Sequence, residues 1–347
     1  MYHGCITNLK LPWDVDVRIY EKVWAGVDIG GTKTAVVLSS NPPVVLKRIE
    51  FPTHSQNGPG PAVKGIIRAI HEALVSQQLT PADLHAIGVS CGSPQDPVAG
   101  VIQAPPNLST WIDVPITSLL SNEFGVQCHL ENDANAGALA EYHYGAGKGS
   151  RSMVFLTMGT GLGAGLILDG RLYRGITFAA GEIGHVRLTR SGPVGYHKAG
   201  SAEGWASGAG MAQIATRSVQ RALERGQTTT LTKNGDGANG VTAPLSAREV
   251  WMQAQQGDVI AQNIIRNSGR KLGEALAILI DLLNPDCIVI GGLAMRMGDA
   301  ILGPARDVAR RESLVASFDA CRIVAARLDE EIGDVASLCI AMGETKS

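Results

Sequence analysis

The sequence predicts an α/β protein of two similar lobes, each a mixed sheet flanked by helices, with a cleft between them. The order β-β-β-α-β-α can be traced twice along the 347 residues, and each copy has a glycine-rich turn between its first two strands. This length accommodates two domains with substantial cores. The first lobe is expected over 1–132, with 1–22 as an extension, and the second over 133–330, with the hinge near 131–135. The last helix, about 331–347, is expected to pack back on the first lobe.

The first half of the chain alternates apolar runs with turns, which indicates strands. These strands are expected at 23–28, 34–39, 44–51, 84–90 and 126–130. Apolar residues recur at helical spacing over 61–78, and a second helix is expected over 134–144. The stretch 91–110 is rich in Gly and Pro, so it is expected to form a loop.

The second half repeats this pattern around the second glycine-rich turn. Strands are expected at 153–157, 163–168, 171–173 and 287–290, and helices at 208–225, 246–256 and 258–283. The polar, glycine-rich segment 228–242 is expected to be a surface loop. The apolar stretch 272–290 contains acidic residues and a proline, so we interpret it as a helix followed by a strand rather than a membrane span.

Composition and charge favour a cytoplasmic enzyme. Hydrophobic residues make up 45% of the chain and charged residues 18%, as in ordinary globular proteins. The net charge is −2 and the basic residues are scattered, so no nucleic acid partner is expected. The six cysteines form no Cys-x-x-Cys pair, which fits a reducing compartment. The N-terminus lacks a signal-peptide pattern, and no membrane association is expected.

Two glycine-rich turns are the strongest indication of function. The first is Asp28-Ile29-Gly30-Gly31-Thr32-Lys33, and the second is Gly159-Thr160-Gly161-Leu162-Gly163. Because glycine has no Cβ, the backbone N–H groups of such turns can approach an anion closely. The two turns together predict a cleft that holds a polyphosphate, although an ordinary glycine hairpin remains the alternative for the first turn alone.

The first turn does not satisfy the requirements of a P-loop. Gly26 and Gly31 have the G-x-x-x-x-G spacing, but Thr32-Lys33 reverses the required order of Lys and Ser/Thr. A strand rather than a helix is also predicted to follow. A β-hairpin that holds phosphate, with Asp28 nearby for a hydrated Mg²⁺, fits the sequence better.

Asp133 is the best candidate for a catalytic base. It follows a predicted strand and precedes a predicted helix, and ligands favour the carboxyl ends of strands in α/β sheets. The alternative is that Asp133 only caps the helix that begins at Ala134, since Asp and Asn are preferred there. The presence of two phosphate turns in the same chain favours catalysis.

A third candidate site is Gly181-Glu182-Ile183-Gly184-His185, where Glu182 and His185 could bind a polar ligand or a metal. A lone histidine is more often a structural residue. Asn107, in a proline-rich loop, and Glu203 could bind hydroxyl groups. For either one alone, a solvated surface position is the better interpretation.

Taken together, these segments resemble the ROK family of sugar kinases and repressors, within the actin-like and hexokinase-like ATPase superfamily. The resemblance extends over about Trp24 to Gly343 and implies two actin-like, ribonuclease H-like lobes. It rests on the two glycine-rich turns, on Asn132-Asp133-Ala134-Asn135, on Gly291-Gly292, on Ala180-Gly181-Glu182-Ile183-Gly184-His185 and on Gly200-Ser201-Ala202-Glu203-Gly204-Trp205-Ala206-Ser207-Gly208.

The resemblance implies a role for each of these residues. Asp133 would deprotonate a sugar hydroxyl as it attacks the γ-phosphorus of ATP, and Asp28 would hold Mg²⁺ through water. The sugar would be held by Asn107, Asn132, Asp133, Glu182, His185 and Glu203. ATP and its phosphates would be held by Asp28, Gly30, Gly31, Thr32, Lys33, Gly159, Thr160, Gly161, Gly291 and Gly292. The implied cofactors are ATP and Mg²⁺, and a homodimer is common in the family.

One departure from the family concerns zinc. ROK kinases commonly carry a Cys-x-Cys-Gly-x-x-Gly-Cys segment that completes a zinc site with the signature histidine. The corresponding segment here is Val194-Gly195-Tyr196-His197-Lys198-Ala199-Gly200-Ser201, which has no cysteine. Structural zinc needs four good ligands, and only His185 and His197 remain. Zinc is therefore predicted to be absent, and His185 is expected to serve the sugar or the local fold.

Glucose, phosphorylated on its 6-hydroxyl, is the expected substrate. Fructose, mannose, allose, N-acetylglucosamine and N-acetylmannosamine are alternatives, because one or two loop residues decide among them. A sugar-responsive repressor would need a helix-turn-helix domain, and too few residues precede Val23 for one. The remaining alternative is a sugar-binding pseudokinase, against which Asp133 and the two intact turns argue.

Overall fold

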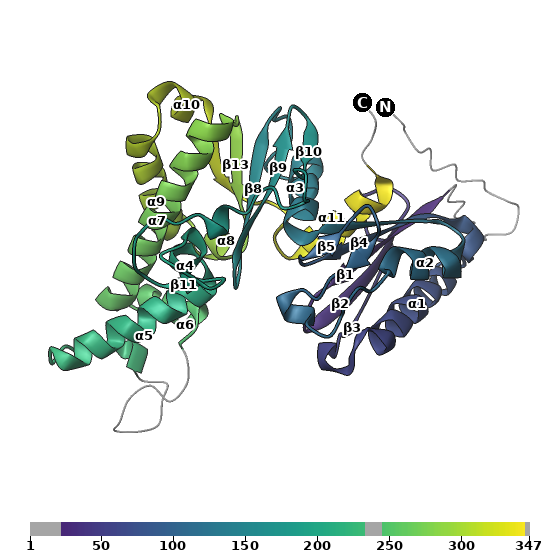
Figure 1. The fold of residues 1–347 in the computed structure, drawn as a ribbon, viewed down its shortest axis with the longest axis horizontal. Helices are drawn as coiled ribbons and strands as arrows, with labels where there is room; N and C mark the ends of the chain where they lie inside the picture. Colours follow the sequence, from purple (N-terminus) through teal and green to yellow (C-terminus); the bar gives the residue numbers. More distant parts are fainter. Residues whose placement is uncertain (1–21, 233–244, 344–347) are drawn as a thin grey trace, which may run out of the picture. The chain divides into compact units, whose positions relative to one another are not determined.

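The computed structural model describes residues 22–232 and 245–343, which form two compact units (Figure 1). Unit 1 contains the chain up to Ala140 and again from Glu330, and unit 2 is Glu141–Asp329. This division falls within helix α3 (Asp133–Tyr144) rather than after Asn132. The predicted extension 1–22 lies almost wholly outside the described residues, and so does most of the predicted loop 228–242.

Unit 1 is built on a five-stranded mixed sheet with the order β3-β2-β1-β4-β7. Strand β1 pairs antiparallel with β2 and parallel with β4, which is itself parallel to β7. The strands are β1 (Val23–Ile29), β2 (Lys33–Ser39), β3 (Lys47–Pro52), β4 (Leu84–Cys91) and β7 (Gln127–Asn132). Strand β3 begins later than the expected Val44, because Val44 N–H donates to Asn41 O at 3.0 Å and closes a turn there.

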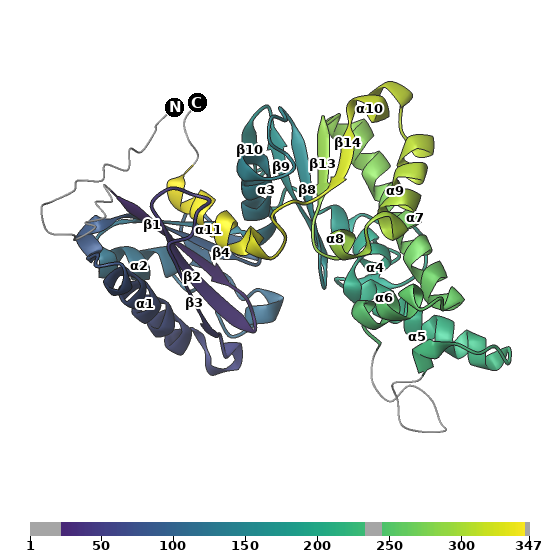
Figure 2. The same cartoon turned by 180° about the vertical axis from the view of Figure 1, so that it is seen from behind.

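The two faces of this sheet carry different residues, because side chains alternate along a strand. Val23, Ala25 and Val27 of β1 are fully buried in one core with helices α1 (Pro59–Ser76) and α2 (Ile116–Phe124). Helix α11 (Ile332–Met342) packs against β1 and β4, and the β1 residues that approach it are Gly26 and Asp28 (Figure 2). The C-terminal helix thus lies on the sheet face that carries Asp28.

The expected loop over 91–110 contains a small hairpin and a 3-10 turn. Ile102 and Leu108 of this segment are fully buried in the core of unit 1, so the segment is partly packed rather than a plain surface loop. The short elements of unit 1 are η1 (Ser55–Asn57), η2 (Pro81–Asp83), β5 (Gln95–Asp96), β6 (Val101–Ile102) and η3 (Pro106–Leu108).

Unit 2 has a second five-stranded mixed sheet, with the order β10-β9-β8-β13-β14. Its pairings repeat those of unit 1: β8 is antiparallel to β9 and parallel to β13, and β13 is parallel to β14. The strands are β8 (Met153–Met158), β9 (Leu162–Leu168), β10 (Arg171–Tyr173), β13 (Cys287–Ile290) and β14 (Arg322–Ala325). The predicted fold class of two mixed sheets flanked by helices is confirmed.

A long insertion separates β10 from β13 in unit 2. It contains η4 (Ile183–His185), β11 (Val194–Gly195), β12 (Lys198–Ala199), α4 (Ala202–Ala206), α5 (Gly208–Glu224), η5 (Thr230–Thr232), α6 (Ala247–Gln255) and α7 (Val259–Leu283). After β13 come α8 (Leu293–Met297), α9 (Asp299–Glu312) and α10 (Val315–Ala320), and η6 (Asp329–Glu331) precedes α11.

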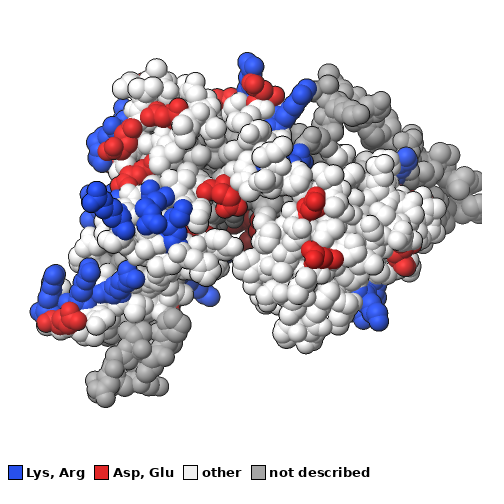
Figure 3. Space-filling model, viewed as in Figure 1, with Lys and Arg blue, Asp and Glu red and all other residues white. Residues whose placement is uncertain are grey.

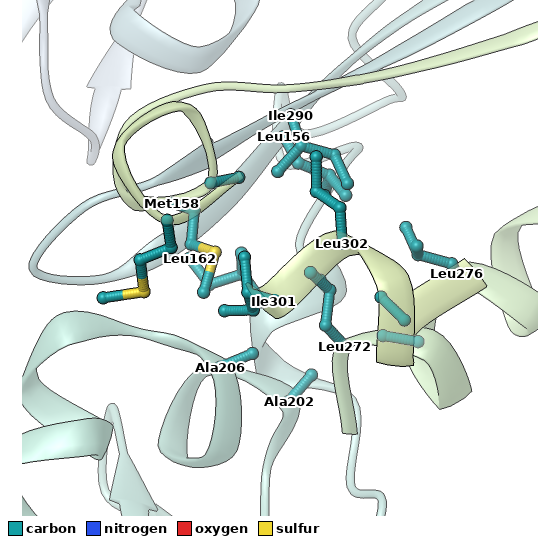
Figure 4. Packing of buried hydrophobic residues seen from close by; sticks show 14 of the residues in the cluster. Leu156, Met158, Leu162, Ala202, Ala206, Leu272, Leu276, Ile290, Ile301 and Leu302 are labelled. Carbon is teal, nitrogen blue, oxygen red and sulfur yellow. The ribbon is translucent and has the colours of Figure 1, made fainter. Parts of the chain in front are cut away.

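The second glycine-rich turn is anchored in the core of unit 2 at both of its ends. Met158 and Leu162, the residues on either side of the turn, are both buried and face the helices (Figure 4). Ile301 of α9 and Ala206 of α4 belong to the same cluster. Full burial of apolar side chains of this size contributes roughly 1.5–3 kcal/mol each, so the two ends of the turn are firmly held.

The charged side chains are unevenly distributed over the surface. On the face shown in Figure 3, Lys and Arg side chains line the part of unit 2 that carries α5. Arg217, Arg221 and Arg225, each four residues after the last, are exposed along this helix and at its end. No helix within the described ranges is both long and apolar enough to cross a bilayer.

Candidate active site

The first glycine-rich turn is a tight hairpin between β1 and β2. Gly30 N–H donates to Lys33 O at 3.0 Å, and Thr53 fastens the turn from β3, its hydroxyl donating to Gly30 O at 2.7 Å. Among residues 22–232 and 245–343, the N–H groups of Gly31 and Thr32 have no hydrogen-bond acceptor. Two adjacent free N–H groups are what an anion such as phosphate requires.

Asn107 lies directly beside this turn. A methyl group placed on Gly31 would lie 2.7 Å from Asn107 O and 2.9 Å from its Cβ, so only glycine allows this approach. A methyl group on Gly92, just after β4, would lie 3.4 Å from Asn107 Oδ1. The structure therefore brings the predicted hydroxyl-binding amide, which is exposed, to the edge of the phosphate turn.

Asp28 is a partly buried carboxylate next to the same turn. Its pKa is raised from 3.8 to about 6, first by desolvation and then by the negative charges of Asp133 and Asp334. A hydrogen bond from Ser90 and the charge of Lys33 oppose this rise in the pKa. Asp133 and Asp334 therefore act electrostatically on Asp28, and a carboxylate is the kind of group that suits a hydrated Mg²⁺.

Asp133 is the first residue of α3, and its neighbour Asn132 does most of the helix capping. Asn132 Oδ1 accepts hydrogen bonds from Ala134 N at 2.9 Å and Asn135 N at 3.3 Å, while its Nδ2 donates to Ser93 Oγ at 2.8 Å. Asp133 Oδ1 also accepts from Ala134 N at 2.9 Å. Both residues predicted for the sugar thus lie at the carboxyl end of β7, where one amide hydrogen of Asn132 is still available.

The carboxylate of Asp133 combines solvent access with a raised pKa. The residue is exposed in unit 1. Surrounding protein nevertheless desolvates the carboxylate and raises its pKa, while hydrogen bonds from the backbone at Ala134 and from Asn132 lower it in part. A carboxylate that is both accessible and a stronger base than usual suits proton abstraction from a substrate.

Lys33 points away from the turn that it closes. Its Nζ lies 3.0 Å from Glu50 Oε2 of β3, and Arg48 Nη2 donates to the same oxygen at 2.7 Å. The Lys33 side chain is 65% exposed. It contributes a positive charge near the site rather than a direct contact to the turn.

The second glycine-rich turn joins β8 to β9 and is held by helix α5. Gly159 N–H donates to Gly161 O at 3.1 Å, and the start of α5 donates to the turn, from Gly208 N to Gly159 O at 2.8 Å. The N–H groups of Thr160 and Gly161 have no acceptor in the part of the chain that the structure describes. This turn therefore presents the same pair of free N–H groups as the first.

Gly291-Gly292 lies against the end of β8, beside the second turn. Gly291 N–H donates to Leu156 O at 2.8 Å. Gly292 has a φ of +66°, and a side chain there would overlap Met158 O, so both the backbone conformation and the space require glycine. The pair predicted for the adenosine side thus adjoins the phosphate turn within unit 2.

Glu203 connects the signature segment to the second turn. It lies in the first turn of α4, and its Oε2 accepts a hydrogen bond from Leu162 N at 3.0 Å. A methyl group on Gly161 would lie 2.7 Å from the same oxygen, and one on Gly195 would lie 2.8 Å from Glu203 Cβ. Glu203 is therefore packed between the turn and the β11–β12 hairpin, and its second oxygen has no hydrogen bond within the described ranges.

Glu182 precedes the short helix η4, His185 is its last residue, and both are exposed. Their backbones are joined, with His185 N–H donating to Glu182 O at 3.1 Å. Lys198 Nζ of the hairpin donates to His185 O at 2.9 Å, and the rings of His185 and Tyr196 lie 6.1 Å apart. The hairpin thus supports His185 through polar and aromatic contacts.

The segment predicted to have lost its zinc ligands forms this same hairpin. Gln213 of α5 holds Val194 by two bonds, accepting from its N–H at 3.0 Å and donating to its carbonyl at 2.7 Å. Tyr196 and His197 at its tip have φ values of 36° and 63°. Within the described ranges, no group of three or more His, Cys, Asp or Glu residues is arranged to hold a metal ion.

The predicted site residues therefore gather into two half-sites, one in each unit. The half-site of unit 1 contains Asp28, Gly30, Gly31, Thr32, Lys33, Asn107, Asn132 and Asp133. The half-site of unit 2 contains Gly159, Thr160, Gly161, Glu182, His185, Glu203, Gly291 and Gly292. The sequence analysis missed Ser90 and Ser93, which contact Asp28 and Asn132. Their position at and just after the predicted strand 84–90 was the available signal, by the rule already applied to Asp133.

Comparison with known proteins identifies the family. The model of the ROK family matches residues 24–336. The glucokinase of Halalkalibacterium halodurans is 30% identical over 315 residues, which cover 90% of this chain and 93% of that protein. The N-acetylmannosamine kinase of Salmonella arizonae is 30% identical over 92% of this chain and 98% of its own length. A xylose repressor of Caldicellulosiruptor bescii is 26% identical over 91% of this chain and 77% of its own length.

Solved structures of similar proteins have the same fold. The ROK hexokinase from Thermus thermophilus has a TM-score of 0.77 at 29% identity, covering 92% of this chain and 98% of that one. A ROK family glucokinase from Streptomyces griseus, in complex with glucose and AMPPNP, has a TM-score of 0.70 at 30% identity. That match covers 92% of this chain and 99% of that one.

Proposed function

The chain belongs to the ROK family, its relatives support activity as a sugar kinase, and on this premise we propose that it transfers the γ-phosphoryl group of ATP to the 6-hydroxyl of glucose. The observation that carries the proposal is the unit 1 half-site. There Asp133, an accessible carboxylate with a raised pKa, lies near Asp28, the carboxylate proposed to hold Mg²⁺ through water. The first glycine-rich turn, with its free N–H groups, follows Asp28 directly.

Asp133 is the proposed general base. As the sugar oxygen forms its bond to the γ-phosphorus, the bond from this phosphorus to the bridging oxygen breaks, ADP leaves, and the hydroxyl proton passes to Asp133. Phosphoryl transfer depends mainly on positioning and charge stabilisation, and the base contributes roughly 10²–10⁴-fold. The raised pKa of Asp133 supports this role, because a more basic carboxylate accepts the proton more readily.

The two glycine turns are proposed to hold the phosphates of ATP, and Gly291-Gly292 the adenosine. Mg²⁺ bound with the nucleotide would neutralise the charge that develops on the phosphates. Asp28 would hold the ion through its water shell, in keeping with the preference of Mg²⁺ for retained waters and few carboxylates. The mutual repulsion of Asp28 and Asp133 supports a cation at this place.

The sugar is proposed to be held by Asn107, Asn132, Glu182, His185 and Glu203. The structure gives Glu203 one bonded oxygen and leaves the other available, which is the arrangement of an acceptor for a hydroxyl group. Because Glu203 also contacts the second turn, the same side chain would connect the sugar site to the phosphate site of unit 2.

The β11–β12 hairpin is proposed to keep its shape without zinc. Its sequence offers no thiolate, and the bonds from Gln213 to Val194 and from Lys198 to His185 hold the segment instead. Elemental analysis of the purified protein tests this hypothesis, and one zinc per chain would refute it. We also propose a cytoplasmic homodimer, supported by the family resemblance, which sedimentation of the purified protein tests.

A coupled assay of ADP release across a panel of hexoses and N-acetylhexosamines tests the proposed function. Glucose is expected to give the highest kcat/KM, with glucose 6-phosphate as product. Preference for another hexose or for N-acetylmannosamine would correct the substrate, a possibility that the similarity to an N-acetylmannosamine kinase keeps open. Tight sugar binding with no turnover would instead indicate a regulator or pseudokinase, as the similarity to a xylose repressor allows.

A further inference from the structure

The sheet face that carries Asp28 is covered by α11, and the fit depends on glycines in the sheet. Gly26 of β1 and Gly88 of β4 are register partners in adjacent strands. A methyl group on Gly26 would overlap Ser337, and one on Gly88 would overlap the backbone of Ser337 and Ala341. The absence of side chains in two neighbouring strands therefore lets the helix lie directly on the sheet.

The spacing along the helix matches the spacing along the strand. Asp28 lies two residues after Gly26 on the same face, about 7 Å further along β1. Gly333 lies four residues before Ser337, about 6 Å and one turn earlier along α11. The first turn of the helix consequently meets the carboxylate of Asp28. A methyl group on Gly333 would lie 2.5 Å from Asp28 Oδ2 and 3.2 Å from its Cγ.

An ion pair holds this same turn of the helix. Asp334 follows Gly333, and its Oδ2 accepts a hydrogen bond from Arg48 Nε at 2.8 Å. Arg48 belongs to β3 and is itself held by Glu50, whose Oε2 accepts from Nη2 at 2.7 Å. The first turn of α11 is therefore tied to the edge strand β3, which restrains the helix from sliding over Asp28.

We propose that Gly333 is a positioning residue for Asp28, and that Arg48, through Asp334, holds the helix turn on which Gly333 lies. Because Gly333 has no side chain, the carboxylate of Asp28 can occupy its observed orientation against the helix. The same close approach brings the positive end of the helix dipole beside this carboxylate. A side chain at this position would push the carboxylate away from its observed place, where it is hydrogen-bonded to Ser90. The inference rests on the proposed function in one respect, the role of Asp28 toward the hydrated Mg²⁺ of the nucleotide.

Binding of Mg²⁺–AMPPNP to the full chain, measured by calorimetry, tests this inference. Gly333→Ala is expected to weaken binding about 10- to 100-fold, the range found for residues that support a metal-binding group, with glucose binding unchanged. Gly60→Ala is the matched control, because Gly60 lies in α1 of the same unit and no atom lies within 4 Å of the added methyl group. Arg48→Gln is expected to weaken binding in the same direction without adding any bulk near Asp28.

Wild-type affinity for Mg²⁺–AMPPNP in both Gly333→Ala and Arg48→Gln would overturn the inference. An equal loss of glucose binding and of the unfolding temperature in both variants would also overturn it, since that pattern indicates a general packing defect. Asp28→Asn separates the two proposals. If it weakens Mg²⁺–AMPPNP binding while the other two variants do not, only this inference fails. If it binds as the wild type does, the role proposed for Asp28 fails as well.

Discussion

The two units have the same sheet but carry different chemistry. Both sheets share one strand order and one pattern of parallel and antiparallel pairs, and in both the turn after the first strand offers two free N–H groups among the described residues. In unit 1 the carboxylates near the turn, Asp28 and Asp133, repel each other. In unit 2 the carboxylate Glu203 is bonded to the turn itself. The shared sheet explains why each unit carries such a turn at the same point, whereas the residues around the two turns differ.

The source of the difference is the connection between the third and fourth strands of each sheet. In unit 1 this connection is mainly α1, which covers the sheet and contributes no residue to the predicted site. In unit 2 it holds η4, the β11–β12 hairpin and four helices, and Glu182, His185 and Glu203 all come from it. The comparison places the proposed base, Asp133, in unit 1, and three of the residues proposed to hold the sugar in the insertion of unit 2.

The largest expected effect is that of removing the base of unit 1. Asp133→Asn keeps the shape and an acceptor for Ala134 N–H but cannot take up the proton, so kcat is expected to fall roughly 10²–10⁴-fold. Glucose binding, measured by calorimetry, is expected to stay within a few fold. Asp113→Asn, at an exposed position of the same unit, is the control. Unchanged turnover in Asp133→Asn would exclude this residue as the base.

Glu203 is expected to show that unit 2 couples the sugar to the phosphate turn. Glu203→Gln keeps an acceptor for Leu162 N–H but removes the charge, so the KM for glucose is expected to rise about 10- to 100-fold with the KM for ATP little changed. Glu203→Ala also removes the acceptor, and it is expected to raise both KM values. Steady-state kinetics distinguish the two variants, and identical effects on both substrates would contradict this coupling.

Substitutions of the glycines in the two turns are expected to have smaller effects, and they can be compared as a pair. A methyl group on Gly161 would lie 2.7 Å from Glu203 Oε2, and one on Gly31 would lie 2.7 Å from Asn107 O, whereas one on Gly159 meets nothing within 4 Å. Gly161→Ala and Gly31→Ala are each expected to cost about 1–2 kcal/mol of binding, near a tenfold rise in the KM for ATP. Gly159→Ala should be close to wild type, and an equal loss there would show that crowding is not the cause.

Much of the fold could be predicted because its signals are local. The strands at 23–28, 153–157 and 287–290 are short apolar runs next to glycines, and the structure has strands at each place. Helices α9 and α10 and strand β14 were not predicted, because α9 contains Pro304, which disfavours a helix interior, and α10 and β14 are only six and four residues long. Helices and strands could therefore be predicted where periodic apolar residues or a neighbouring glycine mark them. The arrangement of the layers followed from the repeat of the strand order.

The site divides in the same way between local and long-range information. Asp133 and the two turns are marked by their neighbours in sequence. Gly333 and Asp28 lie close together although they are about 300 positions apart in the sequence, and no local pattern around either residue predicts this contact. Lys33 was predicted from its place in the motif to hold phosphate, and in the structure its Nζ lies 3.0 Å from Glu50 Oε2. Side-chain direction depends on which strand lies alongside, and the motif does not contain that information.

The last prediction concerns the free energy that unit 1 loses by keeping Asp28 ionised. Its pKa is raised from 3.8 to about 6 in the folded protein, first by desolvation and then by the charges of Asp133 and Asp334, so above pH 6 the folded state carries a charge that it disfavours. A shift of this size corresponds to at most about 3 kcal/mol, and solvent screening of a partly buried group reduces it to about 1 kcal/mol.

Asp28→Asn should therefore be more stable than the wild type at pH 7.5, in the absence of Mg²⁺. The difference should shrink as the pH falls through 6 and vanish below 3.8, where the carboxyl is protonated in both the folded and the unfolded chain. Urea unfolding at pH 7.5 and at pH 3.5, or at the lowest pH at which the protein stays folded, measures this. A variant less stable than the wild type at pH 7.5 would show that Asp28 stabilises unit 1, and the contrast between the repelling carboxylates of unit 1 and the bonded carboxylate Glu203 of unit 2 would then disappear.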